Sequence, residues 1–313
     1  MTKTFMRTGY DPELGNTSCE LYRGTVDIKA LTDWFALHQR PLPWREKSCS
    51  PWGVMVSEVM LQQTPVARVE PVWHEWMNRW PYPADLAHAS KADVVTAWGR
   101  LGYPRRALRL HAAAVQIEAD HGGEVPRDLE DLLDLPGIGD YTARAIRTFA
   151  FGIPEPVVDT NVRRVVARAH KGNGEAGPPR VRSDREELWG LMSAEDTRTQ
   201  VQGAKAIMEL GATICTARTP RCEECPLAHA CAWRDAGYPE YRGARAPTQA
   251  RFEGSDRQVR GIILRELRHS DTPVPEDFLA SLWVNRQQFQ RALESLVSDG
   301  LAIREPEGIT LPR

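Results

Sequence analysis

The chain has 313 residues, enough for two or three compact units, and its 42% hydrophobic and 26% charged residues are ordinary for a globular protein. A formal net charge of −2 excludes a polycation, so contacts with nucleic acid would have to come from local basic stretches, such as residues 144–171. No apolar run is long enough to span a membrane, and the first residues lack the apolar core of a signal peptide. We therefore expect a cytoplasmic protein, nucleoid-associated if bacterial.

The pattern is helical almost throughout residues 25–235, after a polar tail at residues 1–24. Ser50-Pro51 predicts a helix start, with serine as N-cap and proline in the first turn. Ser90 opens a second helix through a capping-box pattern. Strand alternation is missing before the C-terminal region, so the sequence predicts an all-α body.

The composition changes after the last cysteine. Residues 236–254 mix glycine, proline and arginine and are predicted to be a linker. Residues 255–313 then predict three helices, the first capped by Ser255, and a β-hairpin around residues 306–308. This is the outline of a winged helix, a fold that binds DNA or packs against protein. Its third helix offers a reading set of Arg286, Gln287, Gln288 and Arg291.

Four of the six cysteines crowd into one short segment with the spacing C-x6-C-x2-C-x5-C. A disulfide scaffold would spread its cysteines along the chain, whereas four thiolates in one loop can wrap a metal centre. Zinc sites usually pair two C-x2-C knuckles, and only one knuckle is present here. The pattern favours a 4Fe–4S cluster over zinc, with four ligands: Cys215, Cys222, Cys225 and Cys231.

The string LPGIGDYTA at residues 135–143 lies between two helical patterns. Its glycines allow a tight turn that brings backbone N–H groups to a helix start, a geometry that binds a phosphate oxygen without base preference. Alone, such a string is only a tight turn. The expected backbone contacts come from Gly137, Ile138 and Gly139.

Glu58 is the only charged residue of an apolar helix between Trp52 and Leu61. A solvated face is a poor explanation for it, because so little of this helix is polar. We expect its pKa to be raised, which would let it hold a proton near neutral pH and act as an acid. Asp159, in VVDTNVRR, precedes another helix and is either a plain N-cap or a functional carboxylate.

Together these strings resemble the MutY-type adenine DNA glycosylases of the helix-hairpin-helix, endonuclease III superfamily, over roughly residues 25–235. SEVMLQQT at residues 57–64 resembles the catalytic helix, with Glu58 at the general-acid position. Asp159 falls at the position of the carboxylate that stabilises or attacks the sugar, and Tyr141 would lie beside Glu58 and Asp159 as a hydrogen-bonding partner. The implied contacts to DNA are Gln63, Thr64, Leu101 and Tyr103, and Trp44 and Arg45 lie near the implied adenine pocket.

The resemblance implies a two-lobed fold, with a six-helix lobe at about residues 45–150 inserted in a cluster lobe of residues 25–44 and 151–235. The sequence departs from the family pattern at Pro65 and at Lys205, and we find no Nudix-like C-terminal domain in it. Bifunctional relatives carry a nucleophilic lysine where this chain has Tyr141, so we expect an enzyme that cuts only the base–sugar bond.

The implied function is hydrolysis of the N-glycosidic bond of adenine mispaired with 8-oxoguanine or guanine in double-stranded DNA, and we expect the enzyme to be a monomer. Two alternatives stay open. One is a thymine or uracil mismatch glycosylase, because GDYT also occurs in that branch, although Glu58 argues against it. The other is a non-catalytic iron–sulfur regulator that binds DNA, which leaves Glu58 and Asp159 unexplained.

Overall fold

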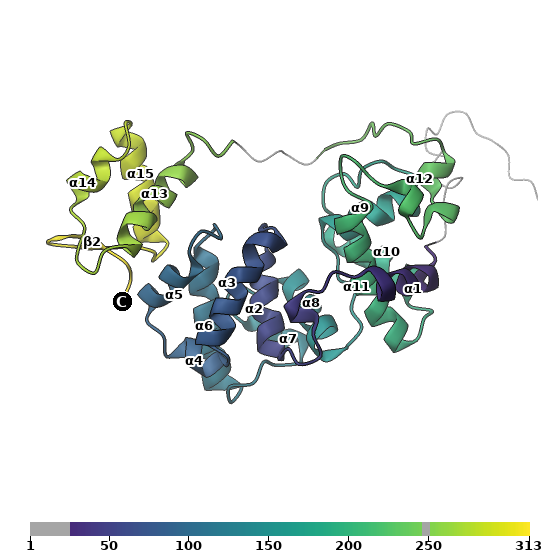
Figure 1. The fold of residues 1–313 in the computed structure, drawn as a ribbon, viewed down its shortest axis with the longest axis horizontal. Coiled ribbons are helices and arrows are strands. Elements are labelled where there is room, and N and C mark those ends of the chain that lie inside the picture. Colours follow the sequence, from purple (N-terminus) through teal and green to yellow (C-terminus); the bar gives the residue numbers. More distant parts are fainter. Residues whose placement is uncertain (1–25, 246–250) are drawn as a thin grey trace, which may run out of the picture. The chain divides into compact units, whose positions relative to one another are not determined.

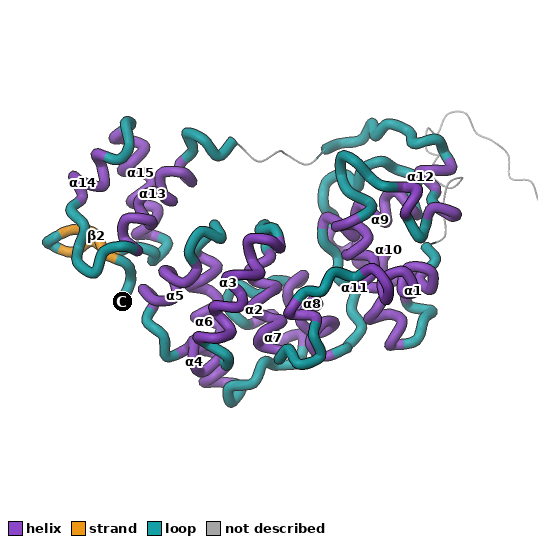
Figure 2. The backbone as a smooth tube through the Cα atoms, viewed as in Figure 1, coloured by secondary structure: helices purple, strands orange, loops and turns teal. Residues whose placement is uncertain are grey.

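A computed structural model describes residues 26–245 and 251–313; the predicted tail at residues 1–24 and part of the predicted linker lie outside them. Figure 2 shows helices over most of this chain, with strands in the C-terminal region. The mainly helical class predicted from the sequence is confirmed. In the described residues, no helix is both long and apolar enough to cross a membrane.

The elements follow one another along the chain as α1 Ile28–His38, η1 Pro43–Arg45, α2 Pro51–Leu61, α3 Val66–Arg79, α4 Pro83–Ala87, α5 Lys91–Trp98, α6 Arg105–Asp120, α7 Leu129–Asp134, α8 Asp140–Phe151, α9 Thr160–Ala169, α10 Val181–Met192, α11 Thr197–Thr213, η2 Cys222–Glu224, η3 Ala228–Ala230, α12 Ala232–Asp235, α13 Asp256–Arg268, α14 Glu276–Ser281, α15 Arg286–Ser298, β1 Ile303–Glu305 and β2 Gly308–Thr310.

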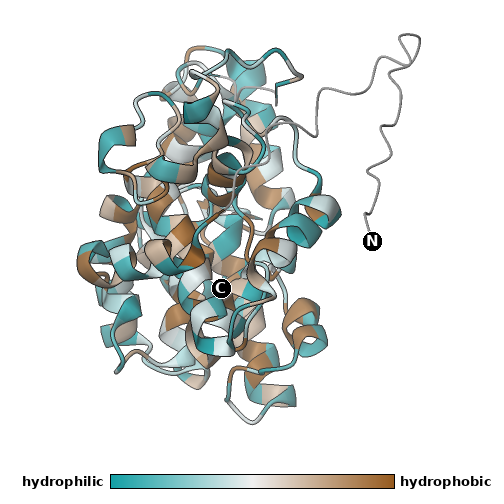
Figure 3. Cartoon of the chain, turned by 90° about the vertical axis from the view of Figure 1, so that its right-hand side faces the viewer, coloured by the Kyte–Doolittle hydropathy of each residue, from teal (hydrophilic) through white to brown (hydrophobic). Residues whose placement is uncertain are grey.

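The described chain divides into two compact units. The first unit comprises residues 26–38, 158–195 and 205–245, and the second comprises residues 39–157, 196–204 and 251–313. The C-terminal residues are thus grouped with the lobe that holds α2 to α8. Figure 1 labels these helices, and Figure 3 shows hydrophobic and hydrophilic residues interleaved along them.

The second unit is built around α2, which packs against α3, α6 and α8 (Figure 1). Every residue of α2 from Trp52 to Met60 is buried. The start of the helix follows the sequence prediction, because the Ser50 hydroxyl accepts from the Gly53 N–H at 3.1 Å. Tryptophans fill the surrounding core, among them Trp76, which meets Trp80 and Trp98 edge to face. This packing fixes the orientation of the side chains of α2.

In the first unit, α9 and α11 cross closely. A Cβ atom at Gly211 would lie 2.8 Å from the carbonyl oxygen of Asn161, so only glycine permits this approach. Buried apolar side chains of α9, including Val162 and Val165, anchor the helix on the other side. The crossing brings the start of α9 next to the end of α11.

The C-terminal region forms α13 to α15 and the strand pair β1–β2, with Phe289, Leu293 and Leu296 fully buried. Two local predictions need correction. The predicted hairpin forms, but its strands pair Ile303 with Thr310 and Glu305 with Gly308, so Gly308 belongs to β2 and not to the turn. Ser255 precedes α13 but makes no side-chain cap; its hydroxyl donates to the Phe252 carbonyl at 2.6 Å instead.

This region packs on α5 and α6 of the same unit. Val95 of α5 belongs to its hydrophobic core, and the Arg268 Nε donates to the Val95 carbonyl at 3.1 Å. Arg105, the first residue of α6, pairs with Asp299 at 3.2 Å. The contacts therefore fall on the two helices that flank the loop of residues 99–104.

Candidate functional site

Glu58 and Tyr141 come together in the second unit, as the sequence predicts for neighbours in an active site. Glu58 is 5% exposed in the middle of α2, and the Tyr141 hydroxyl donates to its Oε2 at 3.2 Å. Tyr141 lies in the first turn of α8, which packs directly on α2. The carboxyl is thus enclosed by apolar side chains of α2 and oriented by the hydroxyl of a neighbouring helix.

The turn of residues 135–139 joins α7 to α8. Gly137 has a φ of 83°, and a Cβ atom there would lie 2.8 Å from the Cβ of Arg109. Gly139 is the N-cap of α8 and adds no side chain there, with open space around its Cα. The Ile138 side chain is 5% exposed and its N–H donates to the Leu135 carbonyl at 3.1 Å, while the expected backbone contacts with phosphate stay a prediction. Ile138 anchors the turn.

The predicted DNA contacts divide into exposed and buried residues. Gln63 is exposed with a φ of 57°, and Tyr103 is 38% exposed with a φ of 47°. Leu101 and Thr64 are 3% and 5% exposed, and the Thr64 hydroxyl donates to the Leu101 carbonyl at 3.2 Å. These two side chains thus support the loops, and their contact with DNA stays a prediction.

Trp44 and Arg45 lie in η1, just before α2. Trp44 is 7% exposed and meets Trp73 edge to face at 5.8 Å, so its ring is part of the core. Arg45 donates from Nη1 to the Arg40 carbonyl at 3.3 Å and is partly exposed. Of the two residues implied to lie near the adenine, only Arg45 presents part of its side chain to solvent.

Asp159 belongs to the first unit and is the N-cap of α9. Its carboxylate accepts from the Val162 N–H and from the Asn161 side-chain amide, both at 2.7 Å. Burial raises the pKa of Asp159, while these hydrogen bonds and the nearby Arg164 oppose that rise. The capping role and the carboxylate role weighed from the sequence are therefore compatible, because one oxygen caps the helix while the whole group is held in place.

A chain of hydrogen bonds connects this carboxylate with the cysteine loop. The Arg164 Nη2 donates to the Asn161 Oδ1 at 2.8 Å and to the Gly211 carbonyl at 2.6 Å, and its Nε donates to the Cys215 carbonyl at 2.7 Å. Sequence reasoning missed Asn161 and Arg164 as supports of Asp159. Their positions two and five residues after it, on a helix it caps, were the available signal.

The four clustered cysteines carry free thiols at the end of α11 and in the loop that follows. Burial, with smaller contributions from the other three thiols, raises the pKa of Cys225 to about 12. The Arg168 Nη1 lies 3.4 Å from the Cys215 sulfur and also donates to the Thr216 carbonyl at 2.7 Å. Within residues 26–245 and 251–313, no three His, Cys, Asp or Glu side chains are close enough to hold one metal ion. Four neighbouring thiols beside a cation fit a polynuclear cluster ligated by thiolates.

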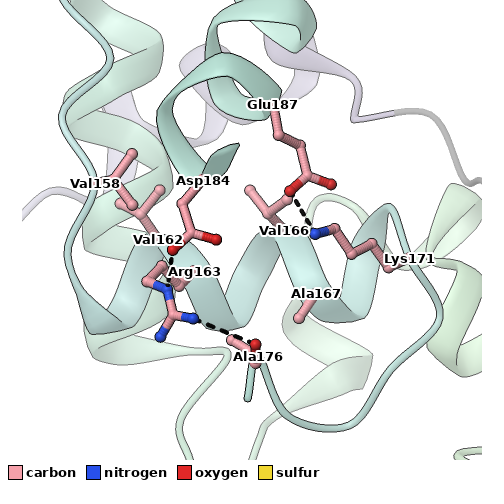
Figure 4. A pocket seen from close by; sticks show the side chains of 9 residues that line it. All are labelled: Val158, Val162, Arg163, Val166, Ala167, Lys171, Ala176, Asp184 and Glu187. Atoms are coloured by element: carbon pink, nitrogen blue, oxygen red, sulfur yellow. Dashed lines mark hydrogen bonds and ion pairs between the residues drawn. The ribbon is translucent and has the colours of Figure 1, made fainter. Parts of the chain in front are cut away.

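The basic stretch of residues 144–171 is committed to intramolecular partners. Arg144 and Arg147 both pair with Glu155, which is 8% exposed. Figure 4 shows Arg163 paired with Asp184 and Lys171 with Glu187 around a cavity of about 20 Å³, room for about one water molecule. The stretch therefore holds loops and helix starts together, and the prediction of a DNA-binding patch from its charge is not supported.

The comparisons with known families agree with this geometry. Residues 56–191 match the HhH-GPD superfamily base excision DNA repair protein family, and residues 215–231 match the iron-sulfur binding domain of endonuclease III. The first match includes Glu58, Tyr141 and Asp159, and the second begins and ends on cysteine ligands. The fold and the site thus define a helix-hairpin-helix base-excision repair protein with an iron–sulfur cluster loop.

Full-length relatives are more specific. An adenine DNA glycosylase of Mycobacterium tuberculosis is 52% identical over 279 residues, covering 89% of this chain and 90% of that protein. The chain belongs to the adenine DNA glycosylase family. The adenine DNA glycosylase of Homo sapiens is 39% identical over 228 residues, covering 69% of this chain and 41% of that protein.

Two further matches concern the wider superfamily. A thymine/uracil-DNA glycosylase of Pyrobaculum aerophilum is 32% identical, covering 64% of this chain and 87% of that protein. The structure of a trapped endonuclease III–DNA covalent intermediate matches with a TM-score of 0.58 and 24% identity, covering 68% of this chain and 95% of that chain. The latter confirms the fold.

We expect Asp159→Asn to keep the α9 cap, since asparagine caps as well as aspartate, and to change how stability depends on pH. A raised pKa in the folded state means that the stabilising contribution of Asp159 is present in acid and is lost as pH rises from 3.8 through the folded value. The variant should therefore gain stability relative to the parent over this window. Thermal unfolding from about pH 4.5 to 7 measures the difference.

Asp196→Asn is the matched control, because Asp196 also accepts from backbone N–H groups at a helix start but is exposed. Hydrogen bonds from Thr199 lower the pKa of Asp196, so its trend with pH should have the opposite sign. Parallel trends for the two variants would contradict the burial of the Asp159 carboxyl.

Proposed function

We propose that the protein hydrolyses the N-glycosidic bond of adenine mispaired with 8-oxoguanine or guanine in double-stranded DNA, without cutting the strand. The observation that carries the proposal is the buried Glu58 carboxyl with the Tyr141 hydroxyl 3.2 Å away, in a chain 52% identical to an adenine DNA glycosylase. Adenine leaves poorly unless a ring nitrogen is protonated, so a preorganised acid is what its excision needs.

In the proposed reaction, Glu58 donates its proton to a ring nitrogen of adenine, and the C1′–N9 electron pair leaves with the base. Asp159, ionised and held by Asn161 and Val162, stabilises the oxocarbenium-like sugar or bonds to C1′. Water then adds to C1′, displacing the Asp159 carboxylate where it has bonded, and gives its proton to the Glu58 carboxylate, which restores the acid and leaves an abasic site. Tyr141 orients Glu58 through its hydrogen bond.

The iron–sulfur cluster would be held by Cys215, Cys222, Cys225 and Cys231, and when bound it supplies metal–thiolate bonds that fix this loop. Arg168 supports the same loop by donating to the Thr216 and Ala217 carbonyls, at 2.7 and 3.1 Å. Arg164 connects the loop with Asn161. These residues hold the end of α11 and the start of α9 in place, and no step of the reaction passes through the cluster.

A second candidate, excision of mispaired thymine or uracil, is favoured by the similarity to the Pyrobaculum aerophilum enzyme. Protonation by a buried acid is less necessary for thymine, whose ring is a better leaving group once its carbonyl oxygens are hydrogen-bonded. A duplex panel with adenine, thymine or uracil opposite guanine, cytosine and 8-oxoguanine separates the two candidates. Release of adenine alone supports the first.

Replacing the acid tests the mechanism directly. Glu58→Gln should bind the mismatched duplex as the parent does but lose excision by roughly 10²–10⁴-fold, because the amide cannot donate the required proton. Single-turnover kinetics and binding titrations measure the two effects. Glu75→Gln, an exposed change on α3, should leave both unaltered. A near-normal rate for Glu58→Gln would assign the acid to another residue.

The absence of a lysine at position 141 predicts monofunctional chemistry. Borohydride should trap little or no enzyme–DNA adduct with the parent protein, and strands should break only after alkali or heat. Tyr141→Lys places an amine at this position and is the informative comparison, since any new adduct must come from it. Efficient trapping by the parent would reveal a different nucleophilic amine.

The C-terminal region is expected to contribute stability more than recognition of the opposite base. Three of the four residues of its predicted reading set have partners within the region: Arg286 pairs with Asp277 at 3.3 Å, Arg291 with Asp256 at 3.5 Å, and the Gln288 amide donates to the Gly254 carbonyl at 2.8 Å. Truncation after Gly254 should lower the melting temperature, because it exposes Val95, yet leave the preference between 8-oxoguanine and guanine nearly unchanged.

Single-turnover excision on the two duplexes, for full-length and truncated protein, measures that preference. Arg291→Ser in the full chain serves as a control that keeps the domain in place. Selective loss of activity opposite 8-oxoguanine in both variants would make the C-terminal region a lesion reader.

A further inference from the structure

Arg106, in the first turn of α6, is 8% exposed and contacts three segments of the second unit. Its Nη1 donates to the Val59 and Met60 carbonyls at 2.8 and 2.9 Å. Its Nη2 donates to the Thr64 hydroxyl at 2.9 Å and to the Gly102 carbonyl at 3.0 Å. One guanidinium thus joins the end of α2, the turn after it and the loop of residues 99–104.

Two aromatic rings complete this environment. The Arg106 guanidinium carbon lies 5.0 Å from the centre of the Trp98 ring and 5.7 Å from that of Tyr103. The Trp98 Nε1 donates to the Gly102 carbonyl at 2.9 Å, so that carbonyl accepts from both side chains. Tyr103 is 38% exposed, and the Arg106 guanidinium packs against its ring.

Stability alone does not explain a buried arginine at this position, because burying its charge costs free energy. Burial lowers its pKa to about 10, and among the described residues no carboxylate pairs with it. A buried charge without a counterion is usually less stable than a well-packed apolar side chain. Carbonyls of the last helical turn do need donors, and a planar fork supplies several at once in a fixed geometry, which lysine cannot. The arginine therefore fixes the end of α2, Thr64 and Gly102 relative to one another.

The placement concerns two strained positions. In the described chain, Gln63, Tyr103 and Tyr238 are the non-glycine residues with positive φ. Gln63 immediately precedes Thr64, and Tyr103 immediately follows Gly102, so Arg106 contacts the residue next to two of the three, through the Thr64 hydroxyl and the Gly102 carbonyl. Strained residues of this kind persist only where surrounding contacts fix them.

We propose that Arg106 is a positioning residue that fixes Tyr103 and Gln63 relative to α2, so that insertion of Tyr103 into the duplex delivers the extruded base to Glu58. The inference rests on the proposed function and adds the unstacking step to it. Glu58 lies in the same helix as Val59 and Met60, whose carbonyls Arg106 holds, and Tyr103 is the exposed ring at the other end of the same contacts. Without this connection the ring and the acid would each persist, but their spacing would relax.

The consequence is a selective defect. Loss of Arg106 should slow extrusion of adenine and leave proton transfer from Glu58 unaltered once the base is extruded, because Arg106 touches no reacting atom. Misplacement of this kind costs roughly ten- to a hundredfold in rate.

The test uses the full-length holoenzyme with Arg106→Met and Arg106→Lys, and with Arg105→Met as matched control. Arg105 is the adjacent residue, its side chain is 55% exposed and it points to Asp299. Iron content and thermal unfolding establish that each variant is folded and loaded. Fluorescence of 2-aminopurine placed beside the mispaired adenine reports unstacking, and single-turnover excision reports the whole reaction.

We expect Arg106→Met to reduce the rate of unstacking and of excision by the same factor, roughly tenfold or more, with an unchanged shape of the pH–rate profile. Arg106→Lys should recover only part of the loss. Adenine opposite an abasic site is already poorly stacked, and the penalty on that duplex should be smaller. Arg105→Met should resemble the parent in all assays.

Several outcomes would overturn the proposal. Equal penalties on the stacked and unstacked duplexes would mean a general structural defect, and an altered pH–rate profile would mean a role in the chemistry. If Arg106→Met does not fold, the lysine variant decides: parental unstacking in Arg106→Lys excludes a need for the fork. Failure of the parent to release adenine contradicts the proposed function separately, whereas the unstacking signal still reports whether Arg106 places Tyr103.

Discussion

The burial of α2 is the constraint on which the rest of the site depends. A helix enclosed on all sides must be apolar almost throughout, and Glu58 is its one ionisable side chain. Keeping a carboxyl there costs stability, which the large tryptophan-rich core around α2 offsets. The Tyr141 hydroxyl gives the group one defined hydrogen bond. The fold thereby holds the Glu58 carboxyl in a fixed orientation, whereas an exposed glutamate side chain would be hydrated and free to rotate.

The second carboxyl has a different environment. Asp159 receives a backbone N–H and an amide N–H and lies near Arg164, all of which favour its charged form against the effect of burial. Glu58 receives its hydrogen bond from a phenol within an apolar helix. The two carboxyls therefore differ in their hydrogen-bond donors, which are N–H groups for Asp159 and a phenol for Glu58. The supports of Asp159 also reach Cys215, so the loop that binds the cluster and the start of α9 share hydrogen bonds.

Much of the fold follows from local sequence signals. The Ser50 and Ser90 caps form as predicted, because both hydroxyls accept from an N–H three residues on. The cysteine spacing predicted the loop that matches an iron-sulfur binding domain. The β-hairpin was also predicted, but with Gly308 in its turn, because a two-residue turn and a three-residue turn fit the same apolar pattern; in the structure Gly308 pairs with Glu305.

The exposure of individual side chains was the other feature that could not be predicted from the sequence. Strings that resemble a DNA contact region include both the residues that reach the surface and the residues that hold them there. Thr64 and Leu101 are buried and bonded to each other, while Gln63 and Tyr103, their neighbours in sequence, are the exposed ones. Arg106, five residues after Leu101, belongs to none of the recognised motifs. It nevertheless connects Thr64 and Gly102, in the two loops, with the end of α2. The basic residues of α8 and α9 show the converse, since their charge suggests a surface role while their partners are internal. In both cases the distinction between contact and support depends on which partner a side chain finds in three dimensions, and a linear pattern specifies only that the side chain is present.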